Sequence, residues 1–182
     1  MRTRAWAGLL SLFLLAGGVT PAGSQTPEPA GFPRLDSARA FELLVTHSAT
    51  PEALALHLRR DFIFRNDPDL FGQVDYWQTP EEFLAQGQGD CEDYALLAAA
   101  VLKRQGIKAF VFSLYGKKGY AHTVCVFVEE GLYSVINQDR LIRCRAQSLQ
   151  ELAGRLCSRW EWGAVAERAG HRGRAVIRIE RL

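Results

Sequence analysis

The sequence predicts an α+β domain in which N-terminal helices and one central buried helix pack on an antiparallel sheet. Three observations support this fold class. Good helix-capping residues recur up to Gly106, the segment after Cys91 is apolar on every side, and Val, Ile, Phe and Tyr dominate after Gly106. Helices followed by strands in this order are typical of an α+β domain.

The N-terminal helices each begin at a residue that caps helices well. Asp36 and Thr50 are good N-caps for the first two helices. Thr79 and Glu82 form a capping box for a third, shorter helix. We expect these helices over residues 36–47, 50–62 and 79–87.

The central helix is expected from Cys91 to Arg104, with Asp90 as its N-cap and Gly106 after its end. Its middle, YALLAAAVL, is apolar on every side, so we expect this helix to be buried all round. It is therefore the element against which the sheet is expected to pack.

Strand-forming residues follow Gly106 in three runs separated by turns, which predicts an antiparallel meander. Another capping box, Ser148 with Glu151, predicts a helix that continues to about Cys157. A last strand is expected near the C-terminus. The expected strands cover residues 107–116, 122–130, 132–144 and 174–182.

Residues 1–24 have the layout of a secretory signal, with Arg2 and Arg4, then an apolar core, then small residues. The apolar core is too short to span a bilayer comfortably, so we expect a cleaved signal peptide and no transmembrane segment after cleavage. An uncleaved N-terminal membrane anchor is the alternative. Residues 25–35 are expected to form a linker, and residues 36–182 a single domain of an exported protein, periplasmic or secreted.

The charge balance argues against nucleic acid as a partner. The chain has 22 basic and 20 acidic residues, and residues 1–24 contain two of the basic residues and none of the acidic ones. Without that segment the chain would carry equal numbers of both. No nucleic acid and no polybasic membrane contact is therefore expected.

Cys91 is the first candidate for chemistry. A thiol at the first turn of a helix lies near free backbone N–H groups and the positive end of the helix dipole, which favour the thiolate. His122 begins an expected strand and is the candidate base. Asn137, near the end of the next antiparallel strand, would return beside His122 and hold its other ring nitrogen, with Asp139 as the fallback.

Alternation along the strand places His122 on the same face as Val124 and Val126, and places Cys125 on the other face. If the His122 face meets the central helix, the imidazole lies where that helix begins. Nucleophile, base and orienting group would then come from a helix start and two neighbouring strands.

The segments DYWQTPEEFLAQGQGDCEDYALLAAAVLKRQGI, AHTVCVF and YSVINQDRLI resemble the bacterial transglutaminase-like cysteine proteinases, whose architecture is papain-like. The resemblance covers roughly residues 70–145, and Trp-x-Thr-Pro with Gly-Asp-Cys-Glu-Asp is its specific part. It implies Cys91 as nucleophile, His122 as general base, and a third member at Asn137, where the family usually has Asp. Asp139 lies two residues further on. A Cys-His-Asn set is sufficient for thiol chemistry.

Three carboxylates beside the thiol, Asp90, Glu92 and Asp93, allow two interpretations. They cap the helix and complement its dipole, or they bind calcium, since a hard cation prefers oxygen ligands. Asp139 could approach such a site from the strand side. Some members that resemble this chain are calcium-dependent periplasmic proteases. The thiol chemistry itself requires no cofactor.

Three side chains before the central helix are candidates for lining the cleft or for donating to an oxyanion: Trp77, Gln86 and Gln88. Trp77 is also a candidate core residue. Among the remaining cysteines, Cys144 and Cys157 form the best candidate pair by proximity in the sequence, and export would permit a disulfide between them.

The leading hypothesis is a thiol-dependent hydrolase, a cysteine peptidase or amidase that acts on an exported peptide or protein substrate. The same acyl-enzyme passed to an amine would make the protein a transglutaminase-type acyl transferase. A non-catalytic binding module on the same fold is the third hypothesis.

Overall fold

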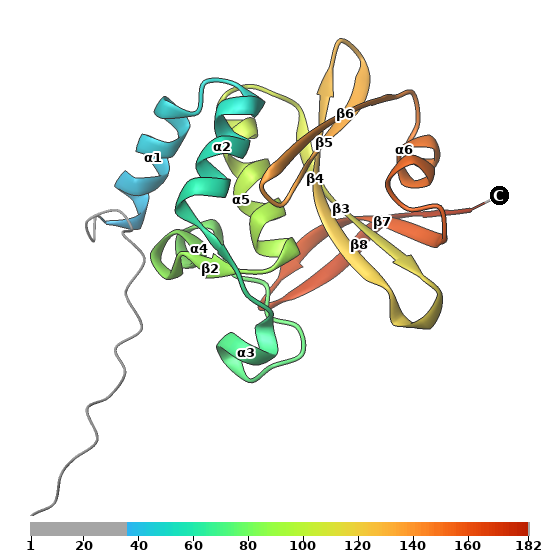
Figure 1. Cartoon of the computed structure of the whole chain (residues 1–182), viewed down its shortest axis with the longest axis horizontal. Coiled ribbons are helices and arrows are strands. Elements are labelled where there is room, and N and C mark those ends of the chain that lie inside the picture. Colours follow the sequence, from blue (N-terminus) through green and yellow to red (C-terminus); the bar gives the residue numbers. More distant parts are fainter. Residues whose placement is uncertain (1–35, 182) are drawn as a thin grey trace, which may run out of the picture.

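The computed structural model describes residues 36–181 of the chain (Figure 1). The signal peptide expected over residues 1–24 and the linker expected over 25–35 lie outside the described residues. Helices lie on both sides of a six-stranded antiparallel sheet. The α+β fold class is therefore confirmed.

The helices begin at the predicted capping residues. The side chains of Asp36 and Thr50 accept backbone N–H groups from the first turns of the first two helices, and Thr79 with Glu82 forms a capping box. No helix within residues 36–181 combines the length and apolar character that a membrane crossing needs. The helices are α1 (Ser37–His47), α2 (Pro51–Asp61), α3 (Asp67–Phe71), α4 (Pro80–Gln86), α5 (Cys91–Arg104) and α6 (Leu149–Leu156).

The main sheet has the strand order β6-β5-β4-β3-β7-β8, and a two-residue parallel pair, β1-β2, lies apart from it. The predicted meander is confirmed, and the run over residues 132–144 divides into two strands. The strands are β1 (Ile63–Phe64), β2 (Gln88–Gly89), β3 (Ala109–Gly116), β4 (Ala121–Glu129), β5 (Leu132–Asn137), β6 (Arg140–Ala146), β7 (Trp160–Ala169) and β8 (Arg172–Glu180).

β7 was not expected from the sequence, although it lies inside the sheet between β3 and β8. Its sequence, WEWGAVAERA, is poor in the β-branched residues that signal strands. The small residues have a packing reason: a Cβ at Gly163 would lie 2.7 Å from Phe112 Cζ on β3. The bulk of Phe112 therefore requires small residues in β7, and small residues do not predict a strand.

Both faces of the main sheet are covered, as Figure 1 shows. Cys125 and Phe127 pack with α5 in one cluster of buried residues, whereas Val124 and Val126 pack with α6 in the other. α5 lies between the sheet and the N-terminal helices. The expectation that α5 is the central buried helix is confirmed.

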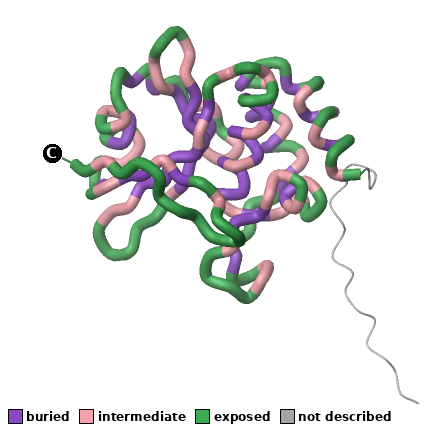
Figure 2. The backbone as a smooth tube through the Cα atoms, turned by 180° about the vertical axis from the view of Figure 1, so that it is seen from behind, coloured by how far each residue is buried: buried purple, intermediate pink, exposed green. Residues whose placement is uncertain are grey.

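β8 forms one edge of the sheet and is exposed along nearly its whole length (Figure 2). The turn between β7 and β8 folds back onto the chain before α4. Arg168 Nε donates to the Trp77 carbonyl at 2.7 Å, and Trp77 N donates to the His171 carbonyl at 3.0 Å. The indole of Trp77 packs so closely on Gly173 that any Cβ there would collide with it. The β7–β8 hairpin therefore holds the segment before α4 in place.

Candidate active site

Cys91 is the first residue of α5, and its side chain is half-buried. Asp90 occupies the N-cap position, as predicted. Gly89 lets the chain pass close to buried side chains beneath it, because a Cβ here would lie 2.7 Å from Gln78 Nε2 and would collide with the Asp93 carboxylate. In the Gly-Asp-Cys sequence, the backbone therefore passes close to buried side chains just before the thiol.

Asp93 is fully buried and holds the segment before α4 against the start of α5. Its Oδ1 accepts from the Gln78 backbone N–H at 2.9 Å, and its Oδ2 accepts from Gln78 Nε2 at 2.7 Å and from the Asp90 N–H at 3.1 Å. Gln78 Nε2 also donates to the Gln88 carbonyl at 3.0 Å. Both oxygens of Asp93 are therefore used within the protein. Sequence reasoning missed Gln78.

Four other carboxylates gather beside the thiol; we call them the acidic cluster: Asp67, Asp75, Asp90 and Glu92. Within this cluster, the ligand atoms of Asp67, Asp75 and Glu92 all lie within 4.8 Å of one another. Sequence reasoning missed Asp67 and Asp75, because α3 and the following loop bring them from outside the cysteine motif. Asp75 is exposed and accepts from Trp77 Nε1 at 2.9 Å.

Burial and mutual proximity make the acidic cluster hard to ionise completely. Burial, followed by the neighbouring Asp90, raises the pKa of Asp67 to about 6 and that of Glu92 to about 9. Among residues 36–181, Asp67 Oδ1 and Asp90 Oδ1 are buried and accept no hydrogen bond. Unpartnered carboxylate oxygens are unfavourable without a proton or a cation to neutralise them.

The Cys91 thiol donates a hydrogen bond to Glu92 Oε2 at 3.2 Å, and no hydrogen bond in the described part of the chain joins it to His122. Burial, followed by Glu92 and Asp90, raises the pKa of the thiol. The backbone N–H of Thr123, the residue after His122, acts in the opposite direction. The helix start favours the thiolate, as expected, but burial and two carboxylates outweigh it and raise the pKa of the thiol.

His122 and Asn137 come together at the open end of β4. His122 Nε2 lies 2.8 Å from Asn137 Oδ1. Because an amide oxygen only accepts, Nε2 carries the proton in this contact and Nδ1 keeps its lone pair in the neutral ring. Asp139 instead contacts two arginines. It accepts from Arg59 Nε at 3.2 Å and lies 3.8 Å from Arg140 Nε. Of the two candidates, the structure places Asn137 against the imidazole.

The alternation expected along β4 is confirmed, but the condition that the His122 face meets α5 is not met. Val124 and Val126, which share the His122 face by alternation, pack on the α6 side of the sheet, and Cys125 packs on the α5 side. The apolar pattern could not distinguish the faces, because both are covered. Thr123, adjacent to His122, is the β4 residue whose backbone acts on the thiol.

The three candidate oxyanion donors lie in different surroundings. Trp77 is buried, and its indole N–H donates to Asp75. Gln86 is exposed at the end of α4. Gln88 is half-buried in β2, with its carbonyl bound to Gln78. Trp77 is thus a core residue with its donor already engaged.

The suggested Cys144–Cys157 disulfide is wrong, because Cys91, Cys125, Cys144 and Cys157 are all free thiols. Cys144 is buried in β6, and Cys157 follows α6 as its C-cap. Proximity in the sequence did not bring the two side chains together in a bridge.

The acidic cluster fits a hard divalent cation by its donor set. Its donors are carboxylate oxygens, two of which lack any partner within residues 36–181. Asp90 and Glu92 belong to the candidate groups, as the sequence suggested. Asp93 also belongs to one of these groups, with Asp67 and Asp90, but both of its oxygens already accept hydrogen bonds.

The fold and this site define an α+β domain with a cysteine at the start of its central helix and a histidine–asparagine pair on the adjoining strands. The family model described as "Transglutaminase-like domain" matches residues 42–151. The chain therefore belongs to the transglutaminase-like family, which confirms the resemblance seen in its sequence. β7 and β8 lie outside the matched residues.

Solved structures with a similar fold include proteins from two bacteria. Legionella pneumophila LapG is 20% identical, with a TM-score of 0.47 over 72% of this chain and 75% of that one. Its calcium-bound form is 21% identical, with a TM-score of 0.44 over 60% of this chain and 70% of that one. A proposed cysteine protease from Cytophaga hutchinsonii is 16% identical, with a TM-score of 0.45; the match covers 58% of this chain and 38% of that protein. No curated protein matches the chain.

Proposed function

We propose that the protein is a thiol-dependent hydrolase, a cysteine peptidase or amidase, with Cys91 as nucleophile, His122 as general base and Asn137 as the residue that orients the imidazole. The observation that carries this proposal is the 2.8 Å contact between His122 Nε2 and Asn137 Oδ1. It leaves Nδ1 of the neutral ring free to accept a proton. Membership of the transglutaminase-like family adds support.

The reaction begins when the thiol releases Glu92 and gives its proton to His122 Nδ1. The sulfur then forms a bond to the carbonyl carbon of the substrate, and the carbon–nitrogen bond breaks as His122 protonates the departing amine. Water, deprotonated by His122, attacks the thioester and releases the acid and the free thiol. Asn137 accepts from Nε2 throughout and keeps the ring in place.

A divalent cation, with calcium as the candidate, is proposed at the acidic cluster, where Asp67, Asp75, Asp90 and Glu92 would hold it. The two unpartnered oxygens of Asp67 and Asp90 support this assignment. When bound, such a cation supplies positive charge that lowers the pKa of the neighbouring thiol. Asp93 would keep its structural role.

Export is proposed from the layout of residues 1–24, with residues 36–182 forming the functional domain in the periplasm or medium and a peptide or protein as substrate. N-terminal sequencing of the protein recovered outside the cytoplasm tests this. A mature chain that starts near residue 25 is expected, and a chain retained in the membrane with Met1 intact would contradict it.

Alkylation of the reduced protein with mass mapping tests the nucleophile. At about pH 6 with calcium present, we expect Cys91 to react faster than the half-buried Cys157, and His122→Ala to remove this difference. Equal rates at the two thiols, with or without calcium, would contradict the proposal. Added amines then distinguish hydrolysis from acyl transfer, because only a transferase forms the amide product.

Two matched variants test the third member of the site. Asn137→Ala removes the acceptor of the imidazole, and we expect peptidase activity to fall about tenfold to hundredfold. Asp139→Ala removes a partner of Arg59 and is expected to leave activity within about twofold. The reverse order of effects would assign the role to Asp139.

A further inference from the structure

A second site lies beside the turn that connects β3 and β4. This turn contains a short 3₁₀ helix, η1 (Lys117–Gly119). A cavity of about 450 Å³ opens between it and the chain that enters β7. The cavity is lined by Lys117, Arg159, Trp160, Glu161 and Arg181. We call it the basic pocket, because three cations face one carboxylate.

The cations of the basic pocket lack carboxylate partners. Within residues 36–181, none of Lys117, Arg159 and Arg181 forms an ion pair, and neither does Glu161. Arg181 Nη1 donates to the carbonyl of Ser158 at 2.6 Å, which fixes the guanidinium without neutralising it. The pocket is therefore a preformed site of uncompensated positive charge.

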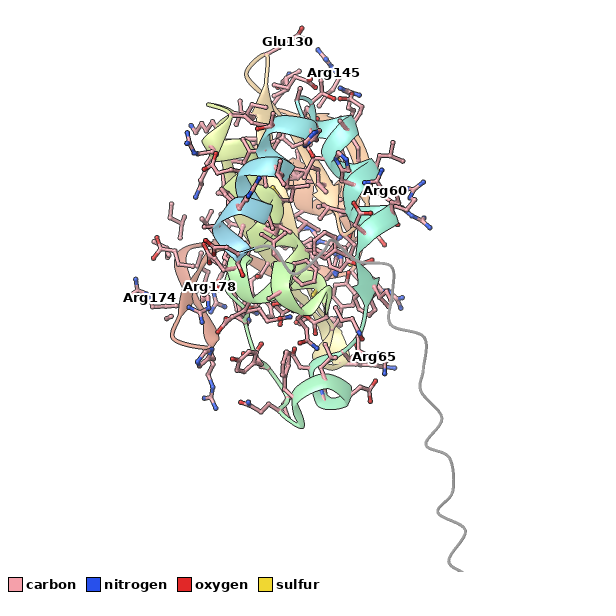
Figure 3. All side chains as sticks on the ribbon, turned by 90° about the vertical axis from the view of Figure 1, so that its left-hand side faces the viewer. Arg60, Arg65, Glu130, Arg145, Arg174 and Arg178 are labelled. Atoms are coloured by element: carbon pink, nitrogen blue, oxygen red, sulfur yellow. The ribbon has the colours of Figure 1, made fainter. Side chains whose placement is uncertain are left out.

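Several arginines on other parts of the molecule are compensated. Arg145, Arg174 and Arg178, labelled in Figure 3, each lie within 3.2 Å of a glutamate oxygen. Arg178 also lies 4.3 Å from the centre of the Trp162 ring. The pocket therefore gathers three cations without ion pairs around one cavity; on β8, Arg172 also forms no ion pair within residues 36–181.

The basic pocket adjoins the candidate active site through the β3–β4 turn. At Gly116 the turn packs on the pocket wall, since a Cβ there would lie 2.8 Å from the Arg159 carbonyl oxygen. The Gly116 N–H donates to the Tyr120 carbonyl at 2.9 Å. His122, the proposed base, is the second residue of β4 and pairs with Leu114 directly beyond this turn. One turn therefore separates the pocket from the proposed base.

We propose that the basic pocket binds the carboxylate of an Asp or Glu side chain that flanks the scissile bond of the substrate. This assignment rests on the proposed peptidase function. Arg159 and Arg181 can each present a planar pair of N–H donors to a carboxylate, and Lys117 adds charge from the turn. Trp160, which is buried, closes the inner end. Free phosphate shares this chemistry and is separated from the peptide by the test.

The test measures binding to the Cys91→Ala protein, so that it does not depend on turnover. Two dye-labelled peptides, Ac-Ala-Gly-Glu-Gly-Ala and the same sequence with Gln in place of Glu, are compared by fluorescence polarisation, with inorganic phosphate as competitor. We expect the Glu peptide to bind about tenfold more tightly than the Gln peptide, and its binding to weaken with salt. Equal binding of the two peptides would overturn the proposal.

Matched variants locate the binding. Arg159→Gln and Lys117→Gln are each expected to weaken binding of the Glu peptide about threefold to tenfold, and Lys108→Gln, an exposed cation at the other end of β3, to change it less than about twofold. Phosphate that binds more tightly than the Glu peptide and displaces it would reassign the pocket to a free anion and overturn the substrate assignment. Retained Glu-peptide selectivity in a protein without peptidase activity would refute the proposed function and leave the pocket as a binding site.

Discussion

The acidic cluster and the basic pocket carry charge of opposite sign in opposite surroundings. Asp67 and Glu92 of the cluster are only 1% and 6% exposed. Lys117, Arg159 and Arg181 of the pocket are exposed. Water solvates the cations at no cost to folding, whereas the buried carboxylates lose hydration and raise one another's pKa.

The difference explains why the two regions need different partners. The acidic cluster lowers the stability of the folded state unless a proton or a cation neutralises it. The basic pocket is stable when empty, so it can bind a ligand that the substrate carries. A tightly held ion is therefore expected at the first site, and an exchangeable carboxylate at the second.

The largest loss of stability is expected from substitution of Asp93, which lies beside the acidic cluster but is not part of it. Asp93→Ala would leave two donors of Gln78 and the Asp90 N–H without an acceptor, so we expect the free energy of unfolding to fall by about 3–5 kcal/mol. Urea denaturation measures the loss. Glu167→Ala, which removes an exposed partner of Arg174, is the control and should cost less than about 0.5 kcal/mol. Similar losses in both variants would show that Asp93 has no special structural role.

Calcium should stabilise the cluster and leave the pocket unaffected. Excess free calcium, at a hundred times its Kd, would raise the free energy of unfolding by about 2.7 kcal/mol. The double variant Asp67→Asn with Asp90→Asn removes the two unpartnered oxygens and should abolish the response, whereas Glu161→Gln in the basic pocket should keep it. Melting of the wild-type protein that is identical in calcium and in excess chelator would count against a cation at this site.

The pH dependence of stability should be weaker when the cation is bound. In chelator, Asp67 has its pKa raised to about 6, so the folded state holds more protons than the unfolded state between about pH 4 and that value. The free energy of unfolding should therefore fall by about 1–2 kcal/mol as the pH rises through this window, and Glu92, raised to about 9, extends the fall upward.

Bound calcium would keep Asp67 and Glu92 ionised and reduce that slope, and the part due to Asp93, whose pKa burial raises to about 7, would remain. Denaturation at several pH values, with calcium and with chelator, measures the free energy of unfolding against pH under both conditions. Asp67→Asn is the control, because it lacks the titration of Asp67. Stability that rises with pH through the same window in chelator would show that the cluster is not strained by burial.

The smallest effect is expected at the basic pocket. Arg159 is exposed and forms no ion pair within residues 36–181, so Arg159→Gln should change the free energy of unfolding by less than about 0.5 kcal/mol. The variant should nevertheless lose affinity for the acidic peptide. A marked loss of stability would mean that the pocket is part of the structural framework, like Asp93.

Local chemistry made much of this protein predictable. Each N-cap predicted for α1, α2, α4 and α5 lies where expected, because a cap depends on residues three or four positions apart. Cys91 was found for the same reason, since a helix start is a local event. The contact between His122 and Asn137 followed from the pairing of two consecutive antiparallel strands.

The missed elements depend on residues distant in the sequence. β7 consists of small residues chosen by the bulk of Phe112, so its own pattern did not show a strand. Asp67 and Asp75 approach Glu92 only because α3 and its loop fold back. Which face of β4 meets α5 could not be read from the sequence, because α5 and α6 cover both sides of the sheet.

The sequence by itself determined where the helices start, which cysteine stands at the end of the buried helix, and which residues surround it along the chain. Those features depend on capping, periodicity and spacing over a few residues. Only the tertiary structure decided whether that thiol is ionised and which carboxylates face it. Desolvation and charge proximity act through space, so a pKa reflects every chain segment that packs around the group.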